Sequence, residues 1–289
     1  MTRAAWWLAI LGGLAVGVLR AEAAAAPETI QFPSADGTTT LVGYLFRPEG
    51  AGRRPAIIML HGRSGPYSSR AGGVYTAATL SGRHLSWARF WQERGYVALL
   101  VDSFGPRGYG AGFPRGSYRQ RPEEVSEQKV RPLDAYGALA HLRTRRDVIG
   151  DRIGLQGWSN GAMTALVTMS DTAPGIARPT PATGFRAAAA LYPGCNMEHV
   201  QRRFVPYASV LMLIAAADDE VSPKACEDLA ARSRAAGAPV ELVVYDGAEH
   251  NFDDPGRAKQ ASEANSRATA DARVRAARLF DTALKRRPG

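Results

Sequence analysis

Short apolar runs, each bounded by turn-forming residues, alternate with amphipathic stretches along most of the chain. Six of these runs are apolar almost without interruption, which is typical of parallel β-strands buried on both faces of a sheet. They are residues 55–60, 96–102, 152–157, 187–192, 210–216 and 240–245. Stretches with helical spacing lie between and after them, at residues 85–94, 132–145, 161–169, 223–235 and 266–286. The repeated order of strand and helix predicts a sheet covered by helices on both faces.

Two shorter strand-like segments, residues 28–33 and 39–47, come before this alternation and are joined through Asp36-Gly37, which indicates a β-hairpin. The expected fold is therefore α/β, a doubly wound and mostly parallel eight-stranded sheet with an N-terminal antiparallel hairpin. No linker divides the chain, so residues 27–289 are expected to form a single domain. Residues 103–122 are irregular and rich in Gly, Pro and Arg, and a long loop inside a compact domain is usually functional.

The first residues have the three-part layout of a secretory signal peptide. Arg3 precedes an uncharged apolar stretch at residues 4–19, and the small residues Ala21 and Ala23 follow it. These 16 residues are fewer than the roughly 20 that a membrane-spanning helix needs. We expect residues 1–23 to be cleaved off, with a cut after Ala25 as a second option, leaving a periplasmic or secreted protein without stable membrane insertion. An uncleaved anchor is the alternative.

Export changes the interpretation of the two cysteines, because an oxidising compartment allows a disulfide to persist. Cys195 follows a strand-like run, and Cys226 comes shortly after Pro223, so both are expected near strand ends at one edge of the sheet. The sequence predicts a Cys195–Cys226 disulfide, with two separate thiols as the alternative. So few cysteines and histidines also argue against a metal site.

Composition and charge exclude several classes of protein. With 289 residues, 45% apolar and 22% charged, the chain is globular rather than disordered. The net charge of +9 comes from Lys and Arg residues that are mostly interleaved with acidic ones. No zinc-finger, RNP or helix-turn-helix pattern accompanies the charge, so a nucleic-acid partner is not expected.

The sharpest chemical signal is Gly157-Trp158-Ser159-Asn160-Gly161, which stands directly after a predicted strand and before a predicted helix. This is the setting that a nucleophile elbow requires. The turn is so tight that Gly157 and Gly161 must lack side chains, and Ser159 is exposed at its apex. The pattern predicts that Ser159 is a nucleophile.

A serine hydroxyl needs a base, and the base needs an acid that orients it. His250 is the one histidine of five that lies in a loop after a late strand and before the last helix. Asp218 and Asp219 follow the strand before that, and we prefer Asp218 as the acid, with Asp219 as the alternative. All three side chains follow the carboxyl ends of strands, where open α/β sheets bind their ligands. Glu220 and Asp246 are interpreted as solvated.

The residues around the predicted nucleophile suggest an oxyanion hole, which needs two backbone N–H donors. One is expected from Asn160 and the other from Arg63, in the loop His61-Gly62-Arg63-Ser64-Gly65. His61 is interpreted as a structural residue that braces this loop. The side chains of Arg63, Arg107 and Trp158 are candidates for substrate binding, the two arginines for an anionic substrate.

On these residues the chain resembles the dienelactone hydrolase family of α/β-hydrolases, in its exported branch with a serine nucleophile. The resemblance extends over residues 29–284. The matching segments are residues 61–65, 101–108, 157–161, 192–195, 218–219 and 250–252. It implies the α/β-hydrolase fold, the triad and ester-type chemistry.

Two differences from that family limit what the resemblance implies. The enzymes that open dienelactones use a cysteine where this chain has Ser159. They also carry a glutamate, in a Gln-Glu-x-x-Gly segment, where this chain has Gly62. The lactone substrate of the family is therefore not carried over.

The sequence as a whole predicts a serine hydrolase that cleaves carboxylic ester or lactone bonds of a small molecule through an acyl-enzyme intermediate. No cofactor or metal is required for that chemistry. A peptidase of the prolyl-oligopeptidase type and a non-catalytic binding protein of the cell envelope with the same fold are the alternatives. The sequence predicts neither the identity of the ester nor the oligomeric state.

Overall fold

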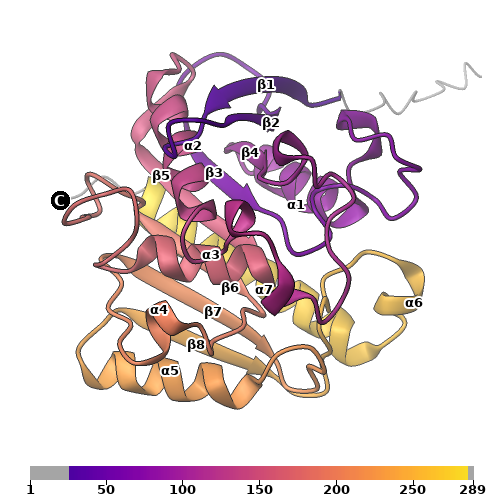
Figure 1. The fold of residues 1–289 in the computed structure, drawn as a ribbon, viewed down its shortest axis with the longest axis vertical. Helices are drawn as coiled ribbons and strands as arrows, with labels where there is room; N and C mark the ends of the chain where they lie inside the picture. The colour runs from indigo at the N-terminus through magenta and orange to yellow at the C-terminus, as the bar shows by residue number, and fades with distance from the viewer. Residues whose placement is uncertain (1–25, 286–289) are drawn as a thin grey trace, which may run out of the picture.

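The computed structural model describes residues 26–285, which form one eight-stranded sheet flanked by helices (Figure 1). The strands are β1 (Glu28–Pro33), β2 (Thr40–Phe46), β3 (Arg54–Leu60), β4 (Val97–Asp102), β5 (Val148–Trp158), β6 (Ala187–Leu191), β7 (Ser209–Ala215) and β8 (Val240–Tyr245). Their order in the sheet is β1-β2-β4-β3-β5-β6-β7-β8. The signal peptide predicted at residues 1–23 lies outside the described residues.

The N-terminal hairpin is the antiparallel part of the sheet. β1 pairs with β2 and β2 with β4 in antiparallel fashion, and every later pairing, from β3 to β8, is parallel. Asp36 shapes the hairpin turn, because its carboxylate accepts hydrogen bonds from the N–H groups of Thr38 and Thr39, both at 2.8 Å. The predicted doubly wound, mostly parallel eight-stranded sheet is therefore confirmed.

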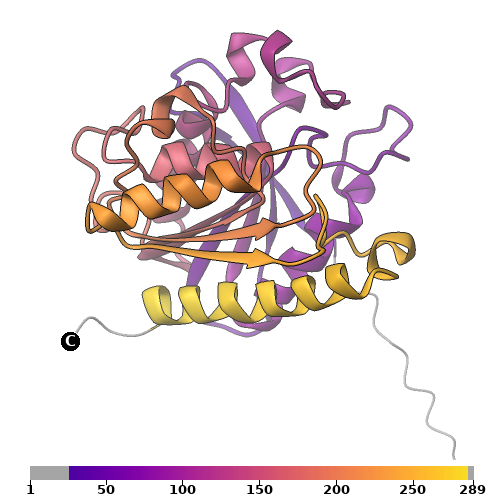
Figure 2. The same ribbon diagram turned by 90° about the horizontal axis from the view of Figure 1, so that it is seen from below.

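Helices cover both faces of the sheet and bury two separate apolar clusters. One cluster lies under α2 (Arg131–Thr144), α3 (Asn160–Met169) and α5 (Pro223–Ala235). The other lies under α1 (Gly82–Glu93) and α7 (Glu263–Phe280). Figure 2 shows α5 (orange) and α7 (yellow) on opposite sides of the sheet. The continuous apolar strands follow from this burial, since each strand from β2 to β7 contributes side chains to both clusters.

Helix starts and one strand start differ from the sequence prediction. The helices α1, α5 and α7 begin after Ser81, Ser222 and Ser262, whose hydroxyls accept a hydrogen bond from the backbone N–H three residues on. These caps place the starts of α1 and α7 three residues earlier than the apolar spacing indicated. β5 begins at Val148, four residues before the predicted start. A shift in register against β3 separates these first residues, 148–151, from the rest of the strand. The short helices α4 (Glu198–Gln201) and α6 (Arg257–Gln260) were not predicted.

A disulfide joins Cys195, in the segment after β6, to Cys226 in the first turn of α5. Both cysteines are buried. The predicted disulfide is thus confirmed, and it links the segment after β6 to the helix that follows the end of β7.

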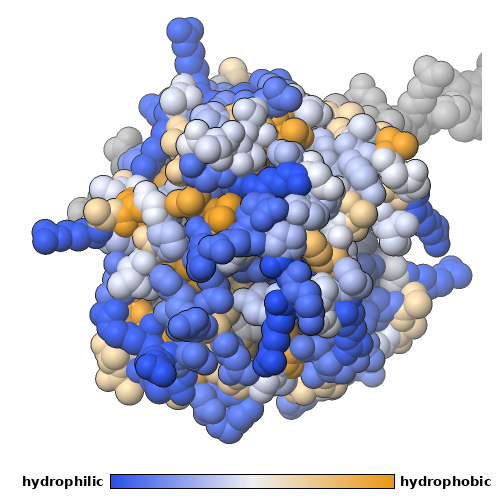
Figure 3. All heavy atoms as spheres, in the orientation of Figure 1, coloured by the Kyte–Doolittle hydropathy of each residue, from blue (hydrophilic) through white to orange (hydrophobic). Residues whose placement is uncertain are grey.

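The molecular surface over α2, α3 and α5 is mostly hydrophilic, and its apolar residues occur in small scattered groups (Figure 3). Large apolar patches on a surface usually mark protein or membrane contacts, and this face shows none among the residues that the structure describes. Within residues 26–285, no helix combines the length and the apolar character that crossing a membrane would need.

Candidate active site

Ser159 lies at a sharp turn between β5 and α3, close to the middle of the sheet. Its backbone has φ 50° and ψ −114°, a strained conformation for a residue with a side chain. The flanking glycines are required by space, because a Cβ on Gly157 would lie 2.2 Å from the carbonyl oxygen of Gly161. A Cβ on Gly161 would lie 2.0 Å from the carbonyl oxygen of Leu60. The turn therefore has the geometry that the sequence motif predicted.

The structure brings His250 and Asp218 to this serine. His250, in the loop after β8, places Nε2 3.1 Å from the Ser159 hydroxyl oxygen. Its other ring nitrogen, Nδ1, lies 2.7 Å from Oδ2 of Asp218, in the loop after β7. All three side chains are nearly or fully buried. With the ring proton on Nδ1, the imidazole donates to Asp218 and accepts from the serine hydroxyl.

The three neighbouring acids after β7 occupy different environments. Asp218 is fixed by its second oxygen, Oδ1, which accepts hydrogen bonds from the N–H groups of Glu220 and Val221. Asp219, the alternative acid, is 70% exposed and pairs with Arg115. The interpretation of Glu220 as solvated is wrong, because its side chain is only 14% exposed and its carboxylate pairs with Arg63. Asp218 is therefore the acid of this loop that contacts Nδ1 of His250.

The loop at residues 61–65 packs directly against the elbow. A Cβ on Gly62 would lie 3.5 Å from Cβ of Ser159. Asn160 is the first residue of α3, so its N–H has no acceptor within the helix. Among residues 26–285, no acceptor takes a hydrogen bond from the N–H of Arg63. Within the described residues, neither of the two predicted donors, the N–H groups of Asn160 and Arg63, therefore has a backbone acceptor.

His61 has the structural role that the sequence suggested. Its Nε2 accepts a hydrogen bond from the N–H of Ser103, and its Nδ1 lies 2.7 Å from the carbonyl oxygen of Gly62. Burial and the neighbouring Arg131 hold the pKa of His61 well below its usual value, so the ring is neutral. Within the part of the chain that the structure describes, no group of His, Cys, Asp and Glu side chains is arranged to hold a metal ion.

The irregular loop at residues 103–122 contacts both sides of the site. Arg121 donates to the side-chain oxygen of Asn160 at 2.8 Å and also pairs with the buried Glu127. Arg115 contacts Asp219, the residue after Asp218. Sequence reasoning marked this loop as functional but did not single out Arg121, because an arginine in a polar loop carries no sign of burial.

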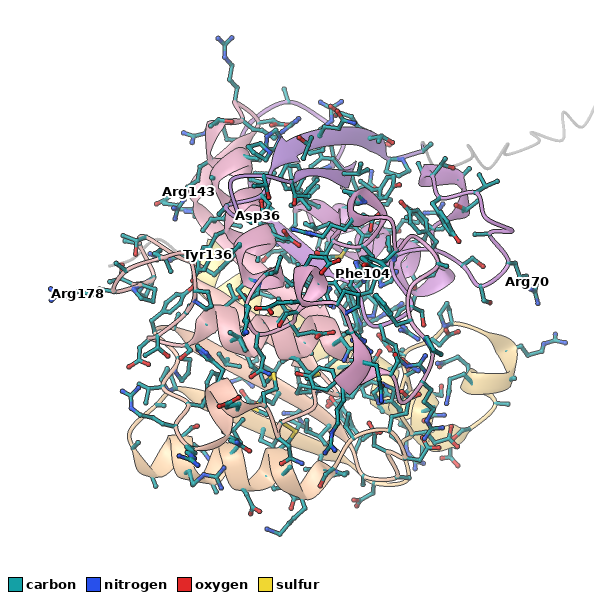
Figure 4. The ribbon with its side chains drawn as sticks, in the orientation of Figure 1. Asp36, Arg70, Phe104, Tyr136, Arg143 and Arg178 are labelled. Carbon is teal, nitrogen blue, oxygen red and sulfur yellow. A yellow bond between two sulfur atoms is a disulfide. The ribbon has the colours of Figure 1, made fainter. Side chains whose placement is uncertain are left out.

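Two candidates for substrate binding are wrong. Arg107 is bound by Asp36 and by both oxygens of Asp134, at 2.7 to 2.9 Å, and only 6% of its side chain is exposed. The Arg107 side chain thus links the irregular loop to Asp134 of α2 and to Asp36 of the hairpin turn, which is labelled in Figure 4. Trp158 is fully buried and its ring packs in the core under α1 and α7. Neither side chain is available to a substrate.

A buried carboxylate that the sequence did not reveal, Asp253, joins the loop of His250 to the elbow. Its Oδ2 accepts hydrogen bonds from the indole N–H groups of Trp158 and Trp87, both at 2.8 Å. Its Oδ1 accepts from the hydroxyl of Tyr192 at 2.5 Å. Trp158 directly precedes Ser159, and Asp253 follows His250 by three residues. This one side chain therefore fixes the loop of His250 relative to the turn at Ser159.

Replacement of Asp253 by asparagine is expected to lower the free energy of unfolding by about 3–5 kcal/mol. An amide presents an NH₂ group where a carboxylate oxygen now accepts, so at least one buried donor loses its partner. Urea unfolding at neutral pH measures this loss. The matched control is Asp254→Asn, since the Asp254 side chain is 45% exposed. Asp254 shares the partner Arg83 with Asp253 but accepts from neither indole nor from Tyr192. A loss of similar size in the control would contradict the role of Asp253.

The parallel sheet and the Ser159–His250–Asp218 arrangement at the carboxyl ends of its strands define an α/β-hydrolase. The family model described as "Dienelactone hydrolase family" matches residues 41–284. The chain belongs to the dienelactone hydrolase family. The resemblance seen in the sequence is thereby confirmed.

Solved structures of low sequence identity share the fold. A Klebsiella pneumoniae protein assigned as a dienelactone hydrolase is 19% identical, with a TM-score of 0.64, and the match covers 89% of this chain and 99% of that one. A dienelactone hydrolase-like promiscuous phosphotriesterase from metagenomic libraries is 18% identical, with a TM-score of 0.63 and coverages of 90% and 99%. Thermogutta terrifontis esterase 2, phosphorylated by paraoxon, is 18% identical, with a TM-score of 0.61 and coverages of 92% and 98%.

Proposed function

We propose that this protein is a serine hydrolase that cleaves carboxylic esters of small molecules through an acyl-enzyme intermediate. The observation that carries the proposal is the chain of contacts from Ser159 to His250 and on to Asp218, 3.1 and 2.7 Å long. Such an arrangement activates a hydroxyl that is otherwise a weak nucleophile. Membership of the dienelactone hydrolase family supports the same class of reaction.

The proposed reaction has two halves that use the same residues. The Ser159 oxygen attacks the ester carbonyl while Nε2 of His250 takes its proton, and the carbonyl oxygen becomes an oxyanion bound by the N–H groups of Asn160 and Arg63. When the bond to the leaving alcohol breaks, Nε2 gives that proton to the alcohol oxygen. Water then attacks the acyl group, with His250 as base, and releases the acid and free Ser159. Asp218 holds the imidazole in the required tautomer throughout.

A phosphate triester tests the nucleophile directly. One of the proteins that share this fold is an esterase phosphorylated by paraoxon. We expect paraoxon to release one p-nitrophenolate per chain, to abolish ester hydrolysis and to add one diethylphosphoryl group to the peptide that contains Ser159, as found by mass spectrometry. Full esterase activity after long incubation, or a label on another residue, would contradict the proposal. Faster turnover of peptides than of simple esters would favour the peptidase alternative.

We also propose that the mature protein works in the periplasm or outside the cell, as a single domain that starts after the leader at residues 1–23. The Cys195–Cys226 disulfide supports this proposal, because such bonds persist mainly in oxidising compartments. The apolar leader in the sequence supports it independently.

A further inference from the structure

Glu220 is a charged residue at the site that the proposed mechanism does not use. Of the three acids after β7, Asp218 is engaged by His250 and Asp219 is turned to solvent and Arg115. Glu220 is turned inward like Asp218, with 14% of its side chain exposed, but it does not contact Nδ1 of His250. Its position therefore needs a separate explanation.

The Glu220 carboxylate lies beside the atoms that react. Its Oε2 is 3.8 Å from Nε2 of His250, the same nitrogen that lies 3.1 Å from the Ser159 hydroxyl oxygen. Arg63 holds the carboxylate in place by two hydrogen bonds, from Nε to Oε2 at 3.1 Å and from Nη2 to Oε1 at 3.0 Å. Each carboxylate oxygen still has a free lone pair. Oε2 can therefore interact with a further group that approaches Nε2.

The group that approaches Nε2 during the reaction is the leaving group. In the proposed mechanism Nε2 donates a proton to the leaving oxygen, so that oxygen must come within about 3 Å of it. The carbons attached to that oxygen then lie within a few ångströms of Glu220. The acyl part of the ester and its oxyanion point toward Asn160 and the N–H of Arg63 instead. Glu220 thus belongs to the side of the site that receives the alcohol.

The charge on Glu220 is retained at neutral pH. Burial opposes its ionisation, but the hydrogen bonds from Arg63 and the nearby His250 and Arg115 outweigh burial, so the pKa of Glu220 is below its usual value. The Arg63 guanidinium pairs with this carboxylate from the loop at residues 61–65, and Oε2 lies 3.8 Å from Nε2 of His250. A leaving group that reaches Nε2 therefore lies close to a negatively charged oxygen.

We propose, building on the proposed hydrolase function, that Glu220 forms a leaving-group subsite that favours esters of cationic alcohols and disfavours esters of anionic ones. The favoured class carries an ammonium group a few atoms from the ester oxygen. Electrostatic attraction to Glu220 distinguishes such an alcohol from a neutral one of the same shape.

Three acetyl thioesters test this subsite, because their leaving thiols are detected by the same colour reaction. Acetylthiocholine carries a positive charge, 3,3-dimethylbutyl thioacetate is its neutral analogue, and S-acetyl-2-mercaptoethanesulfonate is negative. We expect kcat/KM for the cationic ester to exceed that for the neutral one by about 10-fold, the size of one charge interaction at a partly exposed site. The anionic ester should be the slowest of the three.

Two variants separate the subsite from the general charge of the surface. Glu220→Gln keeps the size of the side chain and should lower the cationic-to-neutral ratio by about 10-fold relative to the wild type. Asp219→Asn removes one negative charge from the adjacent, exposed position and should leave the ratio as in the wild type. An unchanged ratio in Glu220→Gln, or an equal change in Asp219→Asn, would overturn the subsite. Thioester hydrolysis that persists in Ser159→Ala would instead overturn the proposed function.

Discussion

Replacement of Ser159 by alanine is expected to lower kcat for ester hydrolysis by about 10⁶-fold. Without the hydroxyl, His250 has no nucleophile to activate, and the remaining donors can only assist direct attack by water. The rate is measured with p-nitrophenyl acetate at saturating concentration, corrected for the spontaneous reaction.

The variant should fold as the wild type does, because the hydroxyl of Ser159 contributes little to packing at the apex of the turn. Its free energy of unfolding is expected to stay within about 1 kcal/mol of the wild-type value. Ser266→Ala, which changes an exposed serine on α7, is the control for serine loss in general and should retain full activity. Wild-type rates in folded Ser159→Ala would end the assignment of this residue as nucleophile.

The topology explains why the site could be predicted in outline. Ser159, Asp218 and His250 are far apart in sequence, but each follows the carboxyl end of a parallel strand, β5, β7 or β8. Parallel strands place those ends at one edge of the sheet, so strand prediction alone brings the three loops together. The apolar runs that identify the strands are strong signals because both faces of the sheet are buried.

The parts that escaped prediction depend on which way a loop side chain turns. Arg107 and Arg63 are both arginines in loops near the site, yet the first is held by two aspartates away from it and the second faces the triad. The direction of each arginine side chain is set by a partner more than 25 residues away in sequence, which is Asp134 for Arg107 and Glu220 for Arg63. Asp253 was missed for the same reason, since its indole and phenol donors come from three different elements.

Asp218→Asn is expected to lower kcat by about 10⁴-fold while leaving the fold intact. The asparagine oxygen can still accept from the N–H groups of Glu220 and Val221, which Oδ1 of Asp218 does now. The amide NH₂ then faces Nδ1 of His250 and donates to it. The ring proton moves to Nε2, and this nitrogen can no longer take the proton of Ser159.

The adjacent Asp219 provides a matched control, because Asp219→Asn makes the same chemical change one residue away at a 70% exposed side chain. Its kcat should stay within about 3-fold of the wild type, since its loss removes only a screened surface charge. A larger loss in Asp219→Asn than in Asp218→Asn would assign the acid to Asp219. The comparison is decisive because both variants lose one negative charge from the same loop, and only the first loses the contact that fixes the tautomer of His250.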